Sequence, residues 1–417
     1  MTITNFRKAK NLKVTEVSGQ PTISRTVCLK ITSGDDMTTG TGEIVLDWSN
    51  IADKSDIGIY DENNNLLDYY FESFDAIAET AVIWVYRDWV RDGTVQARIA
   101  YGNGPSDQSV GADTVFDKET DLKAGYLFNE SSGSLLDVTS NNNDGTVSGA
   151  TRGATGIVDG AYSFDGSDDY VATSDYFPEE YTDEIFIEGW LYTNTNSSEQ
   201  IIVSHHKDGD YGYEPSLDGN GNIYIRTSPS SNNWNDTDTG FSYSTGTWFH
   251  IAIIVTSSNR YLYIDGSQVW SDSNGGLNYP TDHKFGIGAK TYNYKYDSNL
   301  DGRVDNLHIR KNAPTNRDDT VAALYDATKS SPELFDQEAG SGTATISGTV
   351  NLSSSGVEGA KLFLVNETTG QLAATTTTDV DGNYKFGVGS GNTYHVVVQY
   401  DDGSTKYNAK SKPYLVP

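Results

Sequence analysis

The fold of this chain is decided by residues 247–270, TWFHIAIIVTSSNRYLYIDGSQVW. Apolar side chains occupy every second position from Phe249 to Val255, the two-residue period of a β-strand, and most positions between them are apolar as well. A turn of small polar residues follows, then a second strand that ends at Asp265-Gly266, a pair that tolerates the positive φ of a tight hairpin. The stretch therefore predicts an antiparallel meander whose first strand is buried on both faces, inside a two-layer packing and not at an edge.

Composition places the rest of the chain in the same class. The 417 residues include 41 Gly and 27 Tyr but only 2 Met, which is typical of short strands joined by polar turns. This length predicts about three domains. The single cysteine, Cys28, lies in a strand-like segment and cannot form an internal disulfide, so we expect it to be a small buried apolar side chain.

The net charge of −29 is spread along the sequence and is not gathered in one acidic tail. Such a surface repels nucleic acid and anionic membranes, so neither is an expected partner. No segment approaches the roughly 20 apolar residues of a membrane span, so no membrane insertion is expected. Two interpretations of the acidity stay open: a strongly hydrated surface of the halophilic type, or many turns that bind cations.

Several ordered motifs in the central part of the chain resemble laminin-G-like, concanavalin-A-like lectin domains. These are the Trp-Phe-His strand with its LYIDG continuation, AYSFDGSDDYV at 161–171, EIFIEGW at 184–190 and GRVDNLHI at 302–309. The resemblance covers residues 119–328 and implies a jelly roll. We therefore predict an all-β protein of three consecutive antiparallel β-sandwich domains, the central one a concanavalin-A-like jelly roll.

The flanking regions carry resemblances of their own. Residues 1–118, whose alternating strands end in AYGNG, resemble an uncharacterised β-sandwich module of bacterial and archaeal surface proteins. Its large aromatic residues are expected to be core and not binding surface, since aromatics dominate β cores. Residues 329–342, which mix Pro, Gly, Ser and acids, are predicted to be a linker. Residues 343–417 resemble the carboxypeptidase regulatory-like, prealbumin-type sandwich, which supplies scaffold and no chemistry.

No catalytic constellation is recognisable in the sequence. Nucleophile-elbow, P-loop, zinc-protease and dinucleotide-binding motifs are absent. Some glycoside hydrolases with the same sandwich carry paired carboxylates on one strand, and Glu184 and Glu188 resemble that pattern in part. A retaining pair needs its carboxyl groups about 5 Å apart, whereas four residues along a strand separate the backbones by more than ~12 Å. We therefore expect that the protein is not an enzyme.

A candidate calcium site lies in DSNLDGRVD at 297–305. Its oxygen-bearing side chains and its glycine follow the start of an EF-type loop, but His308 stands where that loop needs a bidentate glutamate. The resemblance to lectin-like sandwiches implies a structural calcium ion near the closing strand, joined by Asp165 if the first and last strands of the domain are neighbours. The alternative is that these residues only form turns. The predicted ligands of a structural Ca2+ are Asp165, Asp297, Asn299, Asp301 and Asp305.

Aromatic residues in polar loops are the candidate glycan-binding residues. Sugars bind by stacking their CH faces on aromatic rings, while polar side chains bind the hydroxyl groups. An aromatic residue in a polar loop is hard to explain as strand core, so Trp234 and Tyr294 rank first. The alternative, in which these rings pack on their own sandwich or at an oligomer interface, stays equally open. The candidates are Tyr211, Tyr213, Trp234, Tyr292, Tyr294 and Tyr296.

Together these features predict a non-catalytic protein of the virion surface, a tail fibre or capsid spike that binds host-surface polysaccharide or glycoprotein. The first residues contain no apolar segment typical of a secretory signal, so we expect the chain to reach the extracellular space in a virion released by lysis. The stretch TKYNAKSKP at 405–413 resembles structural proteins of tailed viruses of halophilic archaea. Other virion structural proteins are expected partners. A single site binds sugar weakly, and several linked sites bind more tightly, so we expect a homo-oligomer. A trimer is usual for fibres.

Two alternatives stay open. In one, the chain is a purely structural component of a virion or surface layer, and its central sandwich contacts neighbouring proteins. In the other, it is an accessory carbohydrate-binding protein of a polysaccharide-degrading system. Glycan binding, incorporation into particles and enhancement of a partner hydrolase distinguish the three hypotheses.

Overall fold

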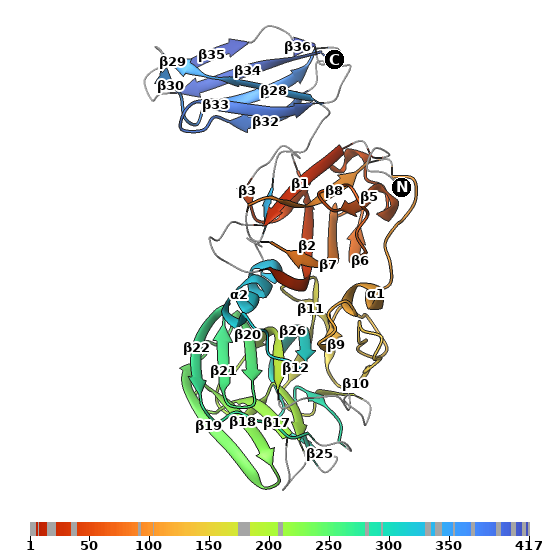
Figure 1. Cartoon of the computed structure of the whole chain (residues 1–417), viewed down its shortest axis with the longest axis vertical. Helices are drawn as coiled ribbons and strands as arrows, with labels where there is room; N and C mark the ends of the chain where they lie inside the picture. The colour runs from red at the N-terminus through yellow and green to blue at the C-terminus, as the bar shows by residue number, and fades with distance from the viewer. Residues whose placement is uncertain are drawn as a thin grey trace.

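Three β-sandwiches lie in a row: the C-terminal one at one end, the N-terminal one in the middle, and the one built from the central sequence at the other end (Figure 1). The predicted all-β class is confirmed. The computed structural model describes residues 6, 8–14, 22–34, 40–90, 93–102, 104–173, 184–206, 212–279, 283–292, 295–329, 335–337, 344–352, 355–367, 372–388, 393–401, 406–410 and 414–415.

The N-terminal sandwich consists of two sheets with an apolar core between them. One strand pair departs from the predicted antiparallel arrangement, since β2 and β4 run parallel. Two short 3-10 helices, Trp48–Asn50 and Lys54–Asp56, connect β4 to β5. The first sheet has the order β3 (Gly40–Thr41), β27 (Phe335–Gln337), β1 (Lys8–Val14), β8 (Val95–Tyr101) and β5 (Ile57–Tyr60), and the second β4 (Ile44–Leu46), β2 (Ile23–Ser33), β7 (Thr80–Trp89) and β6 (Tyr69–Asp75).

β27 lies in the segment 329–342, which the sequence predicted to be a linker. Phe335–Gln337 instead pair with β1 on one side and with β3 on the other. For these residues the linker prediction is wrong, because their backbone groups find hydrogen-bonding partners in a sheet formed far earlier in the chain. The central sandwich is therefore inserted before the last strand of the N-terminal one, and the two are not strictly consecutive.

The central sandwich packs two large sheets face to face. We call the first the front sheet and the second the back sheet. The front sheet has the order β10 (Gly145–Ser148), β13 (Tyr170–Thr173), β23 (Gly286–Ile287), β16 (Val203–His206), β17 (Gly212–Leu217), β18 (Asn222–Ser230) and β19 (Asn233–Ser242), with β15 (Gln200–Ile201) beside β17. The back sheet has the order β11 (Thr151–Thr155), β12 (Gly160–Asp165), β26 (Asp301–Arg310), β14 (Ile185–Thr193), β20 (Trp248–Val255), β21 (Arg260–Ile264) and β22 (Ser267–Asp272), with β9 (Leu122–Tyr126) beside β26.

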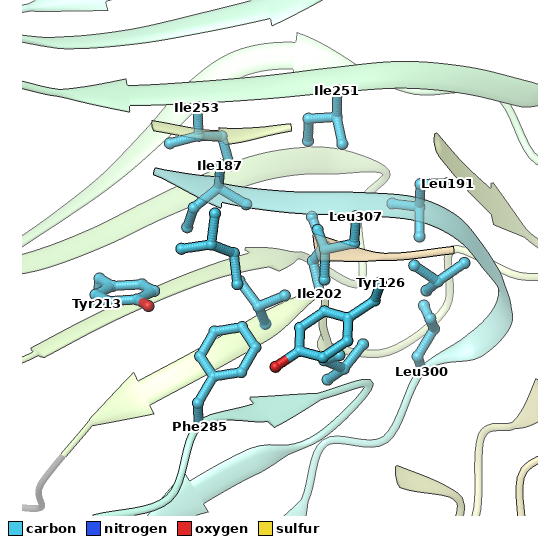
Figure 2. Close-up of a cluster of buried hydrophobic side chains, with 14 of the residues drawn as sticks. Tyr126, Ile187, Leu191, Ile202, Tyr213, Ile251, Ile253, Phe285, Leu300 and Leu307 are labelled. Carbon is cyan, nitrogen blue, oxygen red and sulfur yellow. The ribbon is translucent and has the colours of Figure 1, made fainter. Parts of the chain in front are cut away.

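β20 is the buried strand that the alternation from Phe249 to Val255 predicted. It pairs with β14 and β21, so it is a central strand. Ile251 and Ile253 point into the core between the two sheets (Figure 2), whereas Ile254 packs outward against a helix. Asp265 and Gly266, with φ of 47° and 77°, form the expected hairpin turn. Both faces of the strand are buried.

The helix on the outer face is α2 (Arg317–Thr328), which was not predicted from the sequence. Val321 and Leu324 pack on the back sheet, whereas Ala323 and Ala327 belong to the core of the N-terminal sandwich. A helix that is apolar on two sides lacks the single apolar stripe by which periodicity reveals helices. α2 therefore closes two cores at once, and Figure 1 places it at the junction of the two sandwiches.

A further apolar cluster joins these two sandwiches. Trp84 of β7 packs against Phe116 of the short helix α1 (Ala112–Phe116), with ring centroids 5.4 Å apart. Cys28 lies in the same cluster and is 1% exposed, which confirms the expected buried thiol. Each large apolar side chain buried here stabilises the contact by about 1.5–3 kcal/mol. The remaining buried members are Val115, Leu122, Leu127 and Val158.

Buried charges cross the same junction. Arg310 of β26 is 1% exposed and donates from Nε to Glu119 at 2.8 Å and from Nη1 to Glu188 at 3.1 Å. Glu119 also accepts a hydrogen bond from the backbone N–H of Thr26 in the N-terminal sandwich. Glu188 Oε2 lies 2.9 Å from His250 Nε2. Glu188, one of the two carboxylates compared above with a hydrolase pair, is thus enclosed at the junction.

The C-terminal sandwich has a small core of its own, which includes Leu364 and Phe386. No helix in the described part of the chain has the length and apolar character of a membrane span. The strands are β28 (Ala344–Thr349), β29 (Asn351–Leu352), β30 (Ser355–Gly356), β31 (Lys361–Asn366), β32 (Leu372–Thr377), β33 (Asn383–Val388), β34 (Thr393–Asp401), β35 (Lys406–Lys410) and β36 (Tyr414–Leu415).

Candidate functional site

The outer face of the front sheet carries a row of charged side chains. Along β17 and β18, alternate residues such as Leu217 and Ile225 enter the core. The residues between them point the other way, because successive side chains of a strand lie on opposite faces. Strand register then places Glu214 of β17 opposite Arg226 of β18, and Arg226 opposite Asp236 of β19.

Glu214 is the centre of this row. Its carboxylate is fully buried and accepts from Arg226 Nη1 at 2.6 Å, while His206 Nδ1 lies 3.0 Å and Lys290 Nζ 3.2 Å from its oxygens. Burial alone would raise the pKa of Glu214, but the hydrogen bond with His206 and the charges of Lys290 and Arg226 together hold it below its ordinary value. Glu214 is therefore a fixed anion that orients the two cations and the histidine.

Trp234 lies beside this charged row. Its ring packs edge-on against His206, with centroids 4.8 Å apart and an interplanar angle of 82°, and it is partly exposed. The guanidinium of Arg226 donates from Nε and Nη2 to Asp236, at 3.2 Å and 2.9 Å. Asp236 is exposed. A partly exposed ring next to an oriented Arg–Asp pair is the combination that can stack on a sugar and bind its hydroxyl groups.

A residue of the 247–270 segment holds β18 and β19 in place. Arg260, at the start of β21, is fully buried, and its Nη1 donates to the backbone carbonyls of Ile225 (2.9 Å) and Asn235 (2.8 Å). Its Nη2 lies 2.6 Å from Asp272 of β22. Because one guanidinium binds β18, β19 and the back sheet, the position of the Trp234 strand is fixed from inside the sandwich.

The predicted glycan-binding residues have different outcomes. Trp234 lies on the face just described, whereas Tyr211 and Tyr294 fall outside the described residues. Tyr292 ends β24 (Lys290–Tyr292) and Tyr296 lies in β25 (Lys295–Asp297), a paired hairpin of which only the backbone is described at these positions.

Tyr213 requires a correction. It is 1% exposed and points into the core beside Phe285 (Figure 2), so the prediction that it contacts a surface ligand is wrong. The physical reason is the register of β17: Tyr213 precedes Glu214, and only one of two successive residues points outward. Sequence reasoning missed His206, Glu214, Arg226 and Lys290, although Glu214 in 212–217 and Arg226 in 222–230, each the single charged residue of its strand, were a usable signal.

The predicted calcium ligands are partly brought together. β12 pairs with β26, and Asp165 lies opposite Asp301. Carboxylate oxygens of Asp165, Asp168 and Asp169 lie within 4.8 Å of one another, and Asn299 Nδ2 donates to the carbonyl of Asp169 at 3.0 Å. Oxygens in such a group suit a hard cation such as calcium. Asp168 and Asp169 were not among the predicted ligands, and the side chain of Asp297 is outside the described ones.

Asp305 does not join this group. Four residues along β26 separate it from Asp301 by roughly 13 Å of strand. It is fully buried, and its Oδ2 accepts from the backbone N–H groups of Ile157 and Val158 at 2.6 Å and 2.8 Å. Burial raises the pKa of Asp305 to about 8. The prediction that Asp305 shares a calcium site with Asp165 is therefore wrong.

Two family models match the chain. Residues 165–318 match the concanavalin A-like lectin/glucanases superfamily. The central sandwich is a concanavalin-A-like jelly roll. Residues 53–143 match a domain of unknown function, DUF2341, which extends from the N-terminal sandwich into the start of the lectin-like domain. No curated protein matches the chain.

Solved structures resemble the chain at low identity. Domain 4 of a GH43 extracellular arabinanase from Geobacillus stearothermophilus, in complex with arabinotriose, is 23% identical over 49% of this chain and 98% of that one, with a TM-score of 0.40. The binding domain of botulinum neurotoxin serotype D is 12% identical over 70% and 72%, with a TM-score of 0.39. The binding domain of botulinum neurotoxin DC in complex with SialylT is 10% identical over 70% and 73%, with a TM-score of 0.39.

Proposed function

We propose that this protein is a non-catalytic glycan-binding protein of a virion surface, and that the front sheet of its lectin-like domain contacts the sugar. One observation carries the glycan part of the proposal: a partly exposed Trp234 stands next to the oriented pair of Arg226 and Asp236. The ring provides an apolar platform, and the charged pair provides donors and an acceptor at fixed positions.

Binding to a glycan array tests the proposal. Trp234→Ala is expected to weaken the strongest glycan signal by about tenfold or more, because a central aromatic contact contributes roughly 2 kcal/mol and 1.4 kcal/mol is tenfold. Calorimetric titration with the glycan so found gives the dissociation constants.

Trp248→Ala is the matched control, since Trp248 is also a partly exposed tryptophan of the same domain but lies on the back sheet against Tyr192. It is expected to leave the dissociation constant within about twofold. Equal glycan binding by wild type and Trp234→Ala would contradict the site. No glycan binding, together with stable incorporation into particles, would favour a purely structural component.

The virion part of the proposal needs its own test. The multi-sandwich build and the acidic surface support an extracellular structural role, and multivalency of a homo-oligomer, such as a trimer, would raise a weak single-site affinity. Particles purified from a producing culture and labelled with an antibody against the chain are expected to carry it on their surface. Enhanced activity of a polysaccharide hydrolase on adding the chain, without any labelled particle, would instead indicate an accessory protein.

Calcium binding at the aspartate group stays a prediction. At a free Ca2+ concentration of 100 times the dissociation constant, Ca2+ binding would stabilise the fold by about 2.7 kcal/mol. Adding a chelator is therefore expected to lower the unfolding temperature by several degrees, and Asp165→Asn with Asp168→Asn to remove most of that difference. The control is Asp236→Asn, an exposed aspartate outside the group. An unfolding temperature that the chelator does not change, together with no metal found by elemental analysis, would contradict calcium binding.

A further inference from the structure

A pocket of about 340 Å³ lies where the N-terminal and central sandwiches meet. Tyr70 of β6 forms one wall, Ala112 and Asp113 of α1 another, and the loop between β9 and β10 supplies the rest. The pocket therefore exists only when the two sandwiches are docked. Its size lies within the range of roughly 300–1,000 Å³ that is typical of small-molecule sites.

The pocket is acidic. Asp113, Glu130 and Asp137 line it, and none of the described residues that line it is Lys, Arg or His. An anionic ligand is therefore disfavoured. Among the described residues, these carboxylates do not form a group within 4.8 Å, the separation at which three side chains could hold one metal ion. The ligand that fits is a cationic group larger than a metal ion.

Other groups that line the pocket suit a ligand that carries hydroxyl groups beside its cationic group. The hydroxyl of Tyr70 forms no hydrogen bond within the described part of the chain, and Asn129 and Ser140 add amide and hydroxyl groups. Glu130 accepts from the backbone N–H of Leu136 and from the Tyr162 hydroxyl, each at 2.9 Å, which fixes its position. Each of its oxygens keeps a second lone pair for a ligand. Leu127, Leu136 and Val138 supply apolar contacts.

The electrostatics of the surroundings agree with this chemistry. Beside the pocket, Asn129 Nδ2 donates to Glu72 at 3.2 Å. Burial, with further contributions from Asp305, Asp159 and Glu130, raises the pKa of Glu72 well above its ordinary value, although Trp84 donates to it. Burial likewise raises the pKa of Asp137. A cation in the pocket would favour the ionised forms of both carboxyl groups.

We propose that the junction pocket binds the ammonium group of an amino sugar. Asp113 and Glu130 receive the ammonium, the ring of Tyr70 offers a cation–π face, and Asn129 and Ser140 bind the sugar hydroxyls. Free amino sugar and an amino-sugar unit at the end of a glycan present the same chemistry. The pocket shares no lining residue with the front-sheet site, so this proposal stands or falls independently of the one at Trp234.

Calorimetric titration of the full chain with glucosamine tests this proposal. The titration is run at about pH 6, where an amine is protonated and ordinary carboxylates are ionised. Glucosamine is expected to bind at least tenfold more tightly than glucose or N-acetylglucosamine, which have the same ring and no ammonium. The double variant Asp113→Asn, Glu130→Gln is expected to lose at least tenfold in affinity, and Tyr70→Phe less. Trp248→Ala is the control: Trp248 does not line the pocket, and its replacement is expected to leave glucosamine binding unchanged.

Three results would overturn the proposal: glucose binding as tightly as glucosamine, undiminished glucosamine binding by the double variant, or no glucosamine binding at any soluble concentration. The buried thiol of Cys28 provides a check on folding, because it lies in the apolar cluster that docks the sandwiches. A variant whose Cys28 reacts with a thiol reagent as slowly as in the wild type has kept the junction, so its affinity reports the pocket itself. Repeating the titration with the methyl glycoside of glucosamine distinguishes a site for the free amino sugar from a site for an amino-sugar unit of a glycan.

Discussion

Replacing Arg310 by methionine is expected to lower the free energy of unfolding by about 3–5 kcal/mol. The side chain is 1% exposed, and its guanidinium binds two carboxylates, Glu119 and Glu188, that are themselves buried. Methionine fills a similar volume but leaves both carboxylates without that cation. Urea denaturation at neutral pH, followed by tryptophan fluorescence, measures the loss.

The effect of Arg310→Met is expected to depend on pH. Burial alone would raise the pKa of Glu188, but His308, His250 and Arg310 together hold it well below its ordinary value; Glu119 is lowered in the same way by Arg310 and Arg25. In the wild type, this stabilisation is present above the pKa of an unfolded glutamate, about 4.3, and is lost as the pH falls towards the lower folded value. Without Arg310 the buried carboxyls tend to hold protons, so the difference between the two proteins is expected to shrink on acidification.

Arg303→Met is the control for this prediction, because Arg303 lies on the same strand with its guanidinium carbon 4.9 Å from the ring centroid of Tyr192. Loss of such a contact costs about 0.5–1 kcal/mol. A loss of under ~1 kcal/mol in Arg310→Met, or one that grows as the pH falls, would refute the interpretation of Arg310 as the cation that compensates two buried acids.

Trp84→Ala is expected to open the junction between the N-terminal and lectin-like sandwiches. Removing a buried tryptophan costs about 3–5 kcal/mol. It also deletes the Nε1 group that donates to Glu72 at 2.7 Å. Cys28 reports the opening, because it is the single cysteine, it is buried in the same cluster, and β-sheet register places it opposite Trp84. Burial raises the pKa of its thiol, which keeps it unreactive in the docked state.

The measurement is the rate at which a thiol reagent labels Cys28 under native conditions. If Trp84→Ala lowers the free energy of docking between the two sandwiches by ~3 kcal/mol, Cys28 is expected to be labelled more than a hundredfold faster than in the wild type. Leu364→Ala, an equally buried deletion in the C-terminal sandwich, is expected to leave the rate unchanged. Wild-type labelling rates in Trp84→Ala would mean that this cluster does not hold the two sandwiches together.

The fold was predictable where a single periodicity sufficed. The alternation from Phe249 to Val255 predicts a strand buried on both sides, and β20 is such a strand. The same logic failed for α2, because Val321 and Ala327 face different sandwiches and the helix has no single apolar side. It failed also for β27, since three residues with no strand pattern of their own become a strand only through pairing with β1.

The candidate site was predictable only in part. Trp234 stood out because an aromatic ring in a polar stretch needs an explanation, and it lies on the outer face of the front sheet. The charged row was missed because its members come from separate strands: Glu214 and Arg226 are neighbours through sheet register and not through sequence. Tyr213 illustrates the opposite error, since a one-residue difference in position along β17 decides between ligand contact and core.

The insertion of the lectin-like domain before β27 has a mechanical consequence. The C-terminal sandwich follows β27 in the chain, and β27 is held by backbone hydrogen bonds between β1 and β3. A force applied between the N-terminal end of the chain and the C-terminal sandwich would therefore load the N-terminal sandwich first. The lectin-like domain would experience tension only after β27 had been pulled from its sheet. A domain inserted in this way can keep its shape while the two ends of the chain are pulled apart.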